Sequence, residues 1–170
     1  MEKLVIFDLD GTLLNTIADL GTAANHTLAE LGLPQHTLDE YRLMVGNGMR
    51  KLIMRALPDE KTTDDAFVDN TLAQFLKYYA YHIYIHTRPY PGIPELIKAL
   101  FTDGYKLAVA SNKIQVGAER LIEKFFPGIE FAAVMGNSPL YPLKPDAALV
   151  EYIMAHGWEE NDFTDLSLVS

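Results

Sequence analysis

The chain has 170 residues, somewhat more than one typical domain, so its length favours a single core with an insertion. Hydrophobic residues make up 49% of it, Gly (11) and Pro (9) are not in excess, and there is no cysteine, which excludes a disordered or collagen-like protein, a disulfide scaffold and a thiol nucleophile. The net charge of −9 disfavours nucleic acid and anionic membranes as partners, so an anionic substrate would need a local cluster of positive charge or a metal ion.

Four short apolar runs are typical of strands that are buried in a parallel sheet. The first is Leu4–Phe7, which ends abruptly at Asp8; the others cover residues 106–110, 131–135 and 166–169. Helical patterns lie between the runs, over residues 94–104, 116–125 and 149–157. Strands that alternate with helices predict a doubly wound α/β fold with a mainly parallel sheet and a Rossmann-type core. The first of these helices is expected to carry Pro94 in its first turn and to bury Leu96, Ile97 and Leu100.

Residues 16–88 interrupt this alternation, because no strand is recognisable among them and apolar residues recur at helical spacing. Four helices are expected there, and a capping-box pattern at Thr37 and Glu40 predicts the start of the second. We therefore predict an α/β core formed by residues 1–15 and 89–170. An all-helical domain, residues 16–88, is inserted after the first strand.

The segment from Asp8 to Thr12 carries the clearest chemical signal. Its two carboxylates, Asp8 and Asp10, follow a buried strand at its carboxyl end, where open α/β sheets bind ligands. Gly11 permits a tight turn whose backbone N–H groups can point at an anion. Repulsion between neighbouring carboxylates separates their roles, so that one can be a nucleophile or metal ligand and the other an acid. A surface Asp-Gly turn is the alternative, but it would not require Asp8 directly after an apolar strand.

Asp8-Leu9-Asp10-Gly11-Thr12 resembles the D-x-D-G-T signature of the haloacid dehalogenase (HAD) superfamily of phosphohydrolases. Two further family motifs follow in the right order. Ser111 and Asn112 end the second strand, and Lys144 precedes Pro145, which is expected in the first turn of a helix. The inserted helical region corresponds to the family's helical cap domain. The resemblance therefore implies a HAD-like core with an all-helical cap.

The resemblance implies Mg²⁺-dependent hydrolysis of a small phosphorylated metabolite through an aspartyl-phosphate intermediate. Asp8 would attack the phosphorus, Asp10 would protonate the leaving alkoxide, and Lys144 would supply positive charge. Asp8 and Asp10 would also hold the Mg²⁺ cofactor. The residues expected at the substrate phosphate are Gly11, Thr12, Ser111 and Asn112.

A closer resemblance, which covers nearly the whole chain, is to the phosphoglycolate phosphatase branch of this family. It is carried by Asp19-Leu20, by Val45-Gly46-Asn47-Gly48 and by residues 87–92. It implies 2-phosphoglycolate as the substrate. The candidates for substrate contacts from the cap are Gly46, Asn47, Gly48 and Arg50. A plain turn between two helices and a solvated helix start explain the same residues equally well.

The chain departs from the family at its fourth motif, an acidic pair or cluster that completes the Mg²⁺ site. Residues 166–169 resemble the strand before that motif, and the chain stops at Ser170. Asp162 and Asp165 precede this strand and would lie at its opposite end. Three alternatives therefore stay open: a sugar-phosphate mutase of the same family, a phosphatase for another small metabolite, and a truncated, catalytically silent phosphate-binding protein.

Location and assembly are only loosely constrained by the sequence. No apolar run is long enough to cross a bilayer, and the first residues lack the features of a secretory signal. We therefore expect a cytoplasmic protein, either a monomer or a homodimer, with no nucleic acid or membrane partner.

Overall fold

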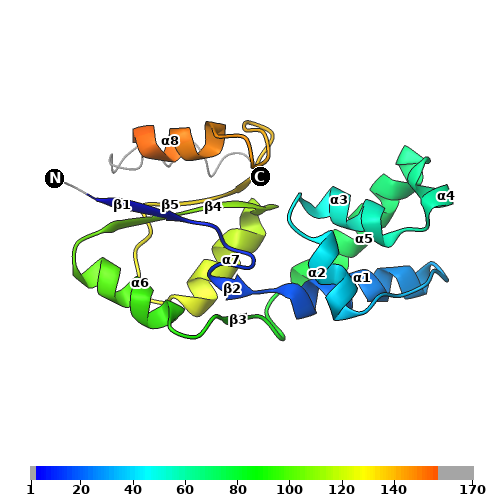
Figure 1. Ribbon diagram of the computed structural model, residues 1–170, viewed down its shortest axis with the longest axis horizontal. Helices are drawn as coiled ribbons and strands as arrows, with labels where there is room; N and C mark the ends of the chain where they lie inside the picture. Colours follow the sequence, from blue (N-terminus) through cyan, green and yellow to red (C-terminus); the bar gives the residue numbers. More distant parts are fainter. Residues whose placement is uncertain (1–2, 157–170) are drawn as a thin grey trace. The chain divides into compact units, whose positions relative to one another are not determined.

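The computed structural model describes residues 3–156, which divide into two compact units (Figure 1). The core unit contains the described residues up to Leu14 and those from Pro89 onwards, and the helical unit is Asn15–Arg88. Where the chain passes between the units, β2 (Leu14–Asn15) and β3 (Arg88–Pro89) pair as a two-stranded sheet. The predicted strand at 166–169 lies outside the described residues.

The core unit contains a parallel sheet in the order β1-β4-β5. Its strands are β1 (Leu4–Phe7), β4 (Lys106–Ile114) and β5 (Ala133–Asn137). Figure 1 shows α8 on one face of this sheet and α6 and α7 on the other. This arrangement confirms the predicted doubly wound α/β fold with a parallel sheet.

The central strand runs further than the sequence predicted. It was expected to end at Ser111, but β4 continues to Ile114, with an irregular register against β5 after Ala110. The reason is that Ser111 and Lys113 are buried despite their polar side chains, and the Lys113 N–H donates to the Ser111 hydroxyl oxygen at 3.1 Å. A polar stretch that satisfies its own hydrogen bonds can remain inside a sheet.

Three helices cover the sheet: α6 (Ile93–Thr102), α7 (Gln115–Phe125) and α8 (Ala148–His156). Pro94 stands in the first turn of α6, as predicted, and Ile97 is fully buried. The predicted burial of Leu96 is wrong, because the buried stripe of α6 is narrow and Leu96 lies at its margin, 45% exposed. The predicted helical position of Pro145 is also wrong. It lies in a turn, and α8 begins at Ala148.

The helical unit contains five helices in the described chain. They are α1 (Ile17–Glu30), α2 (Leu38–Met44), α3 (Met49–Ala56), α4 (Asp59–Thr62) and α5 (Asp65–His82). The predicted capping box at the start of α2 is confirmed, since the Thr37 hydroxyl accepts from the Glu40 N–H at 3.3 Å and Glu40 accepts from the Thr37 N–H at 2.7 Å. The short α4 was not predicted. Among the described residues, none of the helices combines the length and apolarity that crossing a membrane requires.

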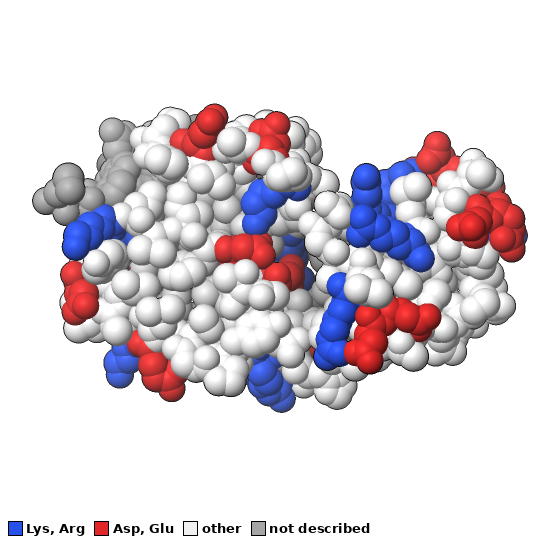
Figure 2. All heavy atoms as spheres, in the orientation of Figure 1, with Lys and Arg blue, Asp and Glu red and all other residues white. Residues whose placement is uncertain are grey.

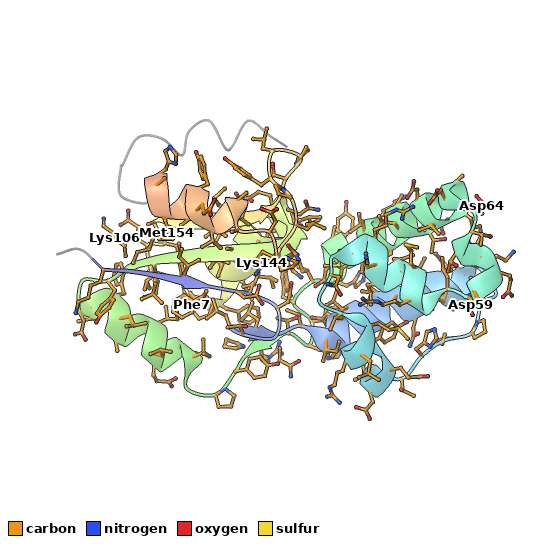
Figure 3. All side chains as sticks on the ribbon, turned by 45° about the horizontal axis from the view of Figure 1, so that its top comes forward. Phe7, Asp59, Asp64, Lys106, Lys144 and Met154 are labelled. Carbon is orange, nitrogen blue, oxygen red and sulfur yellow. The ribbon has the colours of Figure 1, made fainter. Side chains whose placement is uncertain are left out.

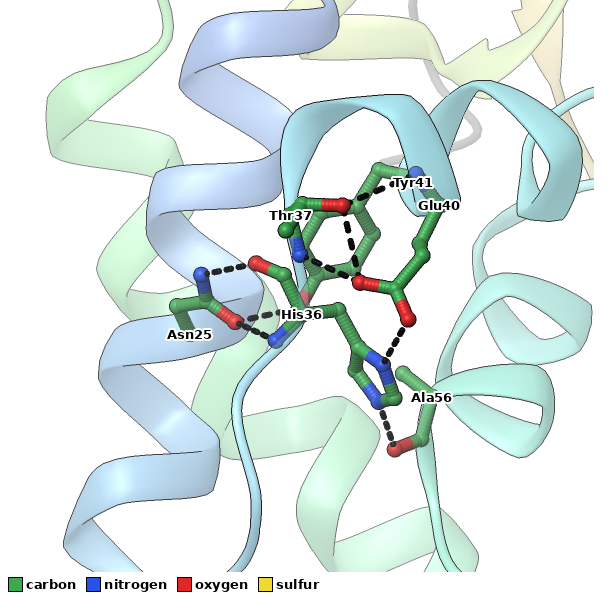
Figure 4. A network of polar contacts seen from close by, with 6 residues as sticks. All are labelled: Asn25, His36, Thr37, Glu40, Tyr41 and Ala56. Atoms are coloured by element: carbon green, nitrogen blue, oxygen red, sulfur yellow. Dashed lines mark hydrogen bonds and ion pairs between the residues drawn. The ribbon is translucent and has the colours of Figure 1, made fainter.

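A polar network joins α1, α2 and α3 (Figure 4). The Asn25 side chain makes hydrogen bonds to the backbone N–H and carbonyl of His36, at 2.9 and 2.8 Å, and accepts from the Tyr41 hydroxyl at 2.7 Å. His36 reaches the Ala56 carbonyl at the end of α3 with Nε2, at 2.8 Å. Burial, with a smaller effect of the Glu40 charge, raises the pKa of Tyr41. The network therefore fixes the segment before α2 with a buried, protonated phenol.

A buried carboxylate, Asp19, fixes the returning chain of the helical unit. One oxygen, Oδ2, accepts from the His86 N–H, the Thr87 N–H and the Thr87 hydroxyl at 3.0, 2.8 and 2.8 Å, and Oδ1 accepts from the His86 N–H at 2.9 Å. Asp19 and Thr87 are both buried. The carboxylate thus anchors the segment just before β3 to the start of α1.

Candidate active site

The loop after β1 is a tight turn around Leu9, whose side chain is buried. The backbone carbonyl of Leu9 accepts from the N–H groups of Leu13 and Leu14 at 3.1 and 3.0 Å. Gly11 has φ +83°, a conformation that a side chain disfavours, and its N–H donates to the Leu14 carbonyl at 2.8 Å. This turn places Asp8 and Asp10 at the carboxyl end of β1.

Lys144 contacts the first of these carboxylates. Its Nζ lies 2.5 Å from Asp8 Oδ1 and 2.6 Å from the Ala110 carbonyl oxygen in β4. The Thr12 hydroxyl lies 3.5 Å from the other carboxylate oxygen of Asp8. Figure 3 shows Lys144 beside the end of the sheet that carries this loop, opposite the end at which Lys106 begins β4. Residues 136 positions apart therefore meet in one ion pair.

Asn112 holds the backbone of Lys144 in place. Its amide nitrogen donates to the Lys144 carbonyl at 3.0 Å, and its amide oxygen accepts from the Lys144 N–H at 2.8 Å. Both hydrogen bonds leave the lysine side chain unengaged by Asn112. The structure gives this residue the position of a support for the loop, whereas its predicted contact with the substrate phosphate stays a prediction.

Lys113 contacts the second carboxylate and was not among the predicted site residues. Its Nζ lies 2.9 and 3.2 Å from the two carboxylate oxygens of Asp10. The Lys113 side chain is 0% exposed and that of Asp10 is 26% exposed. A signal was present in the sequence, since Lys113 stands two residues after Ser111 and therefore faces the same side of an extended strand. The predicted strand ends before Lys113, whereas β4 includes it, and this extension brings its side chain to Asp10.

Ser111 is buried, and its oxygen accepts from the Lys113 N–H, so its hydroxyl proton remains to be donated. The two groups of contacts, Asp8 with Lys144 and Asp10 with Lys113, both start from the five-residue loop after β1. The core unit thus brings together two carboxylates, two ammonium groups and hydroxyl donors. That set suits the binding of an anion next to an oxygen nucleophile.

The predicted cap residues lie in the helical unit and have partners there. Arg50 pairs with Asp65 at 2.6 Å and with Asp69 at 2.9 Å, and these hydrogen bonds raise its pKa. Arg55 donates to the Asn47 side-chain oxygen at 2.8 Å, which fixes the turn between α2 and α3. In that turn, Gly46 and Gly48 have φ +115° and +83°. A role of Gly46, Asn47, Gly48 and Arg50 in substrate choice stays a prediction.

The donor set also fits the implied Mg²⁺ ion. Mg²⁺ prefers oxygen ligands and is commonly bound through one or two carboxylates, substrate phosphate oxygens and water. The Asp8 carboxylate is 39% exposed, so one of its oxygens can reach an ion. Within residues 3–156, no cluster of three or more His, Cys, Asp or Glu side chains forms a metal site.

Figure 2 shows acidic and basic side chains interspersed on the visible face, so the net charge of −9 does not create a uniformly acidic surface there.

The chain matches a known protein family over a stretch that includes the loop with two aspartates and the lysine from a distant segment. Residues 5–161 match the haloacid dehalogenase-like hydrolase family, and the chain belongs to this family. Among its relatives is a phosphoglycolate phosphatase from Agrobacterium fabrum, which is 40% identical over 86% of this chain and 64% of its own length. Another, from Pseudomonas syringae, is 36% identical over 91% of this chain and 57% of its own length. The chain therefore spans about three fifths of these relatives.

Solved structures agree with this assignment. The structure of a predicted phosphoglycolate phosphatase from Haemophilus somnus superposes with a TM-score of 0.81 at 32% identity, covering 91% of this chain and 71% of the other. The fold is also shared with CbbY from Rhodobacter sphaeroides, at a TM-score of 0.73 and 23% identity, over 92% of this chain and 72% of the other. The second likeness is evidence for the fold alone.

Proposed function

We propose that the chain provides the nucleophile and the phosphate site of a Mg²⁺-dependent phosphomonoester phosphatase. The observation that carries the proposal is the 2.5 Å contact between Lys144 Nζ and Asp8 Oδ1 at the carboxyl end of β1. The ammonium donates to the carboxylate and faces the position where phosphate charge would gather. The family and the phosphoglycolate phosphatase relatives support the same reaction.

In this reaction an Asp8 oxygen forms a bond to phosphorus while the bond from phosphorus to the alkyl oxygen breaks. Asp10 gives its proton to the leaving alkoxide and later takes one from the water that hydrolyses the aspartyl-phosphate. Ser111 donates its hydroxyl proton to a phosphoryl oxygen. The Asp8 carboxylate and the Asp10 backbone carbonyl would hold Mg²⁺, which supplies positive charge against the phosphate when it is bound.

The proposed substrate is 2-phosphoglycolate, a small dianionic phosphate ester that also carries a carboxylate. Its support is the identity with relatives of that activity, 40% for the Agrobacterium fabrum enzyme and 36% for the Pseudomonas syringae enzyme. A panel of 2-phosphoglycolate, a hexose phosphate and a nucleoside monophosphate tests this part. The proposal expects the highest kcat/KM for 2-phosphoglycolate, and a clear preference for another ester would replace the substrate but keep the reaction.

Phosphate release by Asp8→Asn, compared with the unchanged chain in Mg²⁺, tests the reaction itself. Loss of a covalent nucleophile lowers kcat by at least about 10³-fold. Asp103→Asn, at the end of α6 and away from the loop after β1, is the matched control and should keep full activity. Equal release by Asp8→Asn and the unchanged chain would exclude Asp8 as the nucleophile, and no release by the unchanged chain would refute the proposed activity.

A further inference from the structure

We propose that Lys113 is the positioning residue for Asp10: it holds the carboxylate in the orientation that proton transfer to the leaving group requires. This inference rests on the proposed function, in which Asp10 is the acid and base. It assigns separate counter-ions to the two aspartates, Lys144 to Asp8 and Lys113 to Asp10.

The geometry of the pair is that of a fixed support. Lys113 Nζ lies within hydrogen-bond distance of both Asp10 oxygens, at 2.9 and 3.2 Å, so it constrains the rotation of the carboxylate as well as its position. Its side chain is wholly buried, whereas Asp10 keeps 26% exposure. The ammonium therefore approaches from the protein side, and part of the Asp10 side chain stays accessible to solvent.

The backbone of Lys113 is itself immobilised by close packing of β5. A Cβ atom at Gly136 would lie only 2.5 Å from the Lys113 carbonyl oxygen, so the two strands touch there through backbone atoms. The side-chain amide of Gln115, two residues after Lys113, binds β5 at two points. Its nitrogen donates to the Val134 carbonyl at 2.7 Å, and its oxygen accepts from the Gly136 N–H at 2.6 Å. A lysine with a fixed backbone and a buried stem has little freedom to move its ammonium group.

A positioning role predicts an effect that depends on the leaving group. An alkoxide needs a proton as the bond to phosphorus breaks, whereas p-nitrophenolate is stable without one. Misplacing Asp10 should therefore slow the phosphorylation of Asp8 by an alkyl phosphate and leave its phosphorylation by p-nitrophenyl phosphate nearly unchanged. General loss of structure would slow both reactions to the same extent.

The test is the rate of the first turnover for Lys113→Met with 2-phosphoglycolate and with p-nitrophenyl phosphate. We expect a loss of about 10²-fold for the alkyl ester, typical of a small misplacement of a reacting group, and less than about threefold for the aryl ester. Lys106→Met, which removes an exposed lysine from the other end of β4, is the matched control and should behave as the unchanged chain. Equal losses on both esters would overturn the inference.

Two further measurements keep the test decisive if Lys113→Met folds poorly. Lys113→Arg keeps the charge and should recover part of the alkyl-ester rate, and adding Lys113→Met to Asp10→Asn should cause no further loss. Independently of turnover, the ¹⁵N signal of the Lys113 ammonium should change in Asp10→Asn and stay unchanged in Asp8→Asn. If the Lys113 ammonium signal were the same in Asp10→Asn as in the unchanged chain, the inference would be refuted. A chain that hydrolyses neither ester would refute only the proposed function.

Discussion

Replacing Asp19 tests how strongly one carboxylate holds the returning chain of the helical unit. Asp19→Ala leaves two buried donors, the N–H and the hydroxyl of Thr87, without their acceptor. Each unsatisfied buried group costs about 1–3 kcal/mol, so the free energy of unfolding should fall by about 2–6 kcal/mol. Asp19→Asn should cost less, because a single oxygen at the place of Oδ2 can still accept from His86 and Thr87. We expect about 1–3 kcal/mol for the weaker neutral hydrogen bonds.

Urea unfolding followed by circular dichroism measures these differences. The matched control is Thr27→Val, which removes a buried hydroxyl in the same helix α1 that donates to the Ala23 carbonyl one turn away. It should cost about 1 kcal/mol or less. If Asp19→Ala destabilised the protein no more than Thr27→Val, the anchoring role of Asp19 would be wrong.

Two more outcomes follow from packing and burial. Gly136→Ala should lower the free energy of unfolding by about 1–3 kcal/mol, because the added Cβ would lie 2.5 and 2.7 Å from backbone atoms of Lys113 and Gln115. An unchanged urea midpoint would contradict this close contact. Burial raises the pKa of Tyr41, so the stability it provides is complete below about pH 10, the pKa of an exposed tyrosine, and is lost as the pH rises through the folded-state pKa. Alkaline titration of the thermal midpoint should therefore show a steeper loss above about pH 10 in the unchanged chain than in Tyr41→Phe.

Local patterns predicted much of this fold, because they encode contacts between near neighbours. The apolar run Leu4–Phe7 forms β1, and the capping box at Thr37 and Glu40 starts α2. The meeting of Asp8 and Lys144 was instead expected from the resemblance to the haloacid dehalogenase family, because no local pattern links residues so far apart. For β1 and α2, the determinant lies within a few residues.

Contacts that depend on packing were beyond the sequence alone. Lys113 looked like a polar residue after a strand, but β4 continues past it to Ile114, and its side chain is buried beside Asp10. The acceptor role of Asp19 joins residues 67 and 68 positions apart, for which a single sequence holds no local signal. The partners of Arg50 depend likewise on how α3 packs against α5.

Asn112 supports the backbone of Lys144, whereas the proposed chemistry depends on the Lys144 side chain. Asn112 holds the peptide groups of residue 144 and does not contact its side chain, so these two hydrogen bonds do not depend on which amino acid stands there. A replacement of Lys144 would therefore remove the contacts of its ammonium with Asp8 and the Ala110 carbonyl, while the support of its backbone by Asn112 would survive.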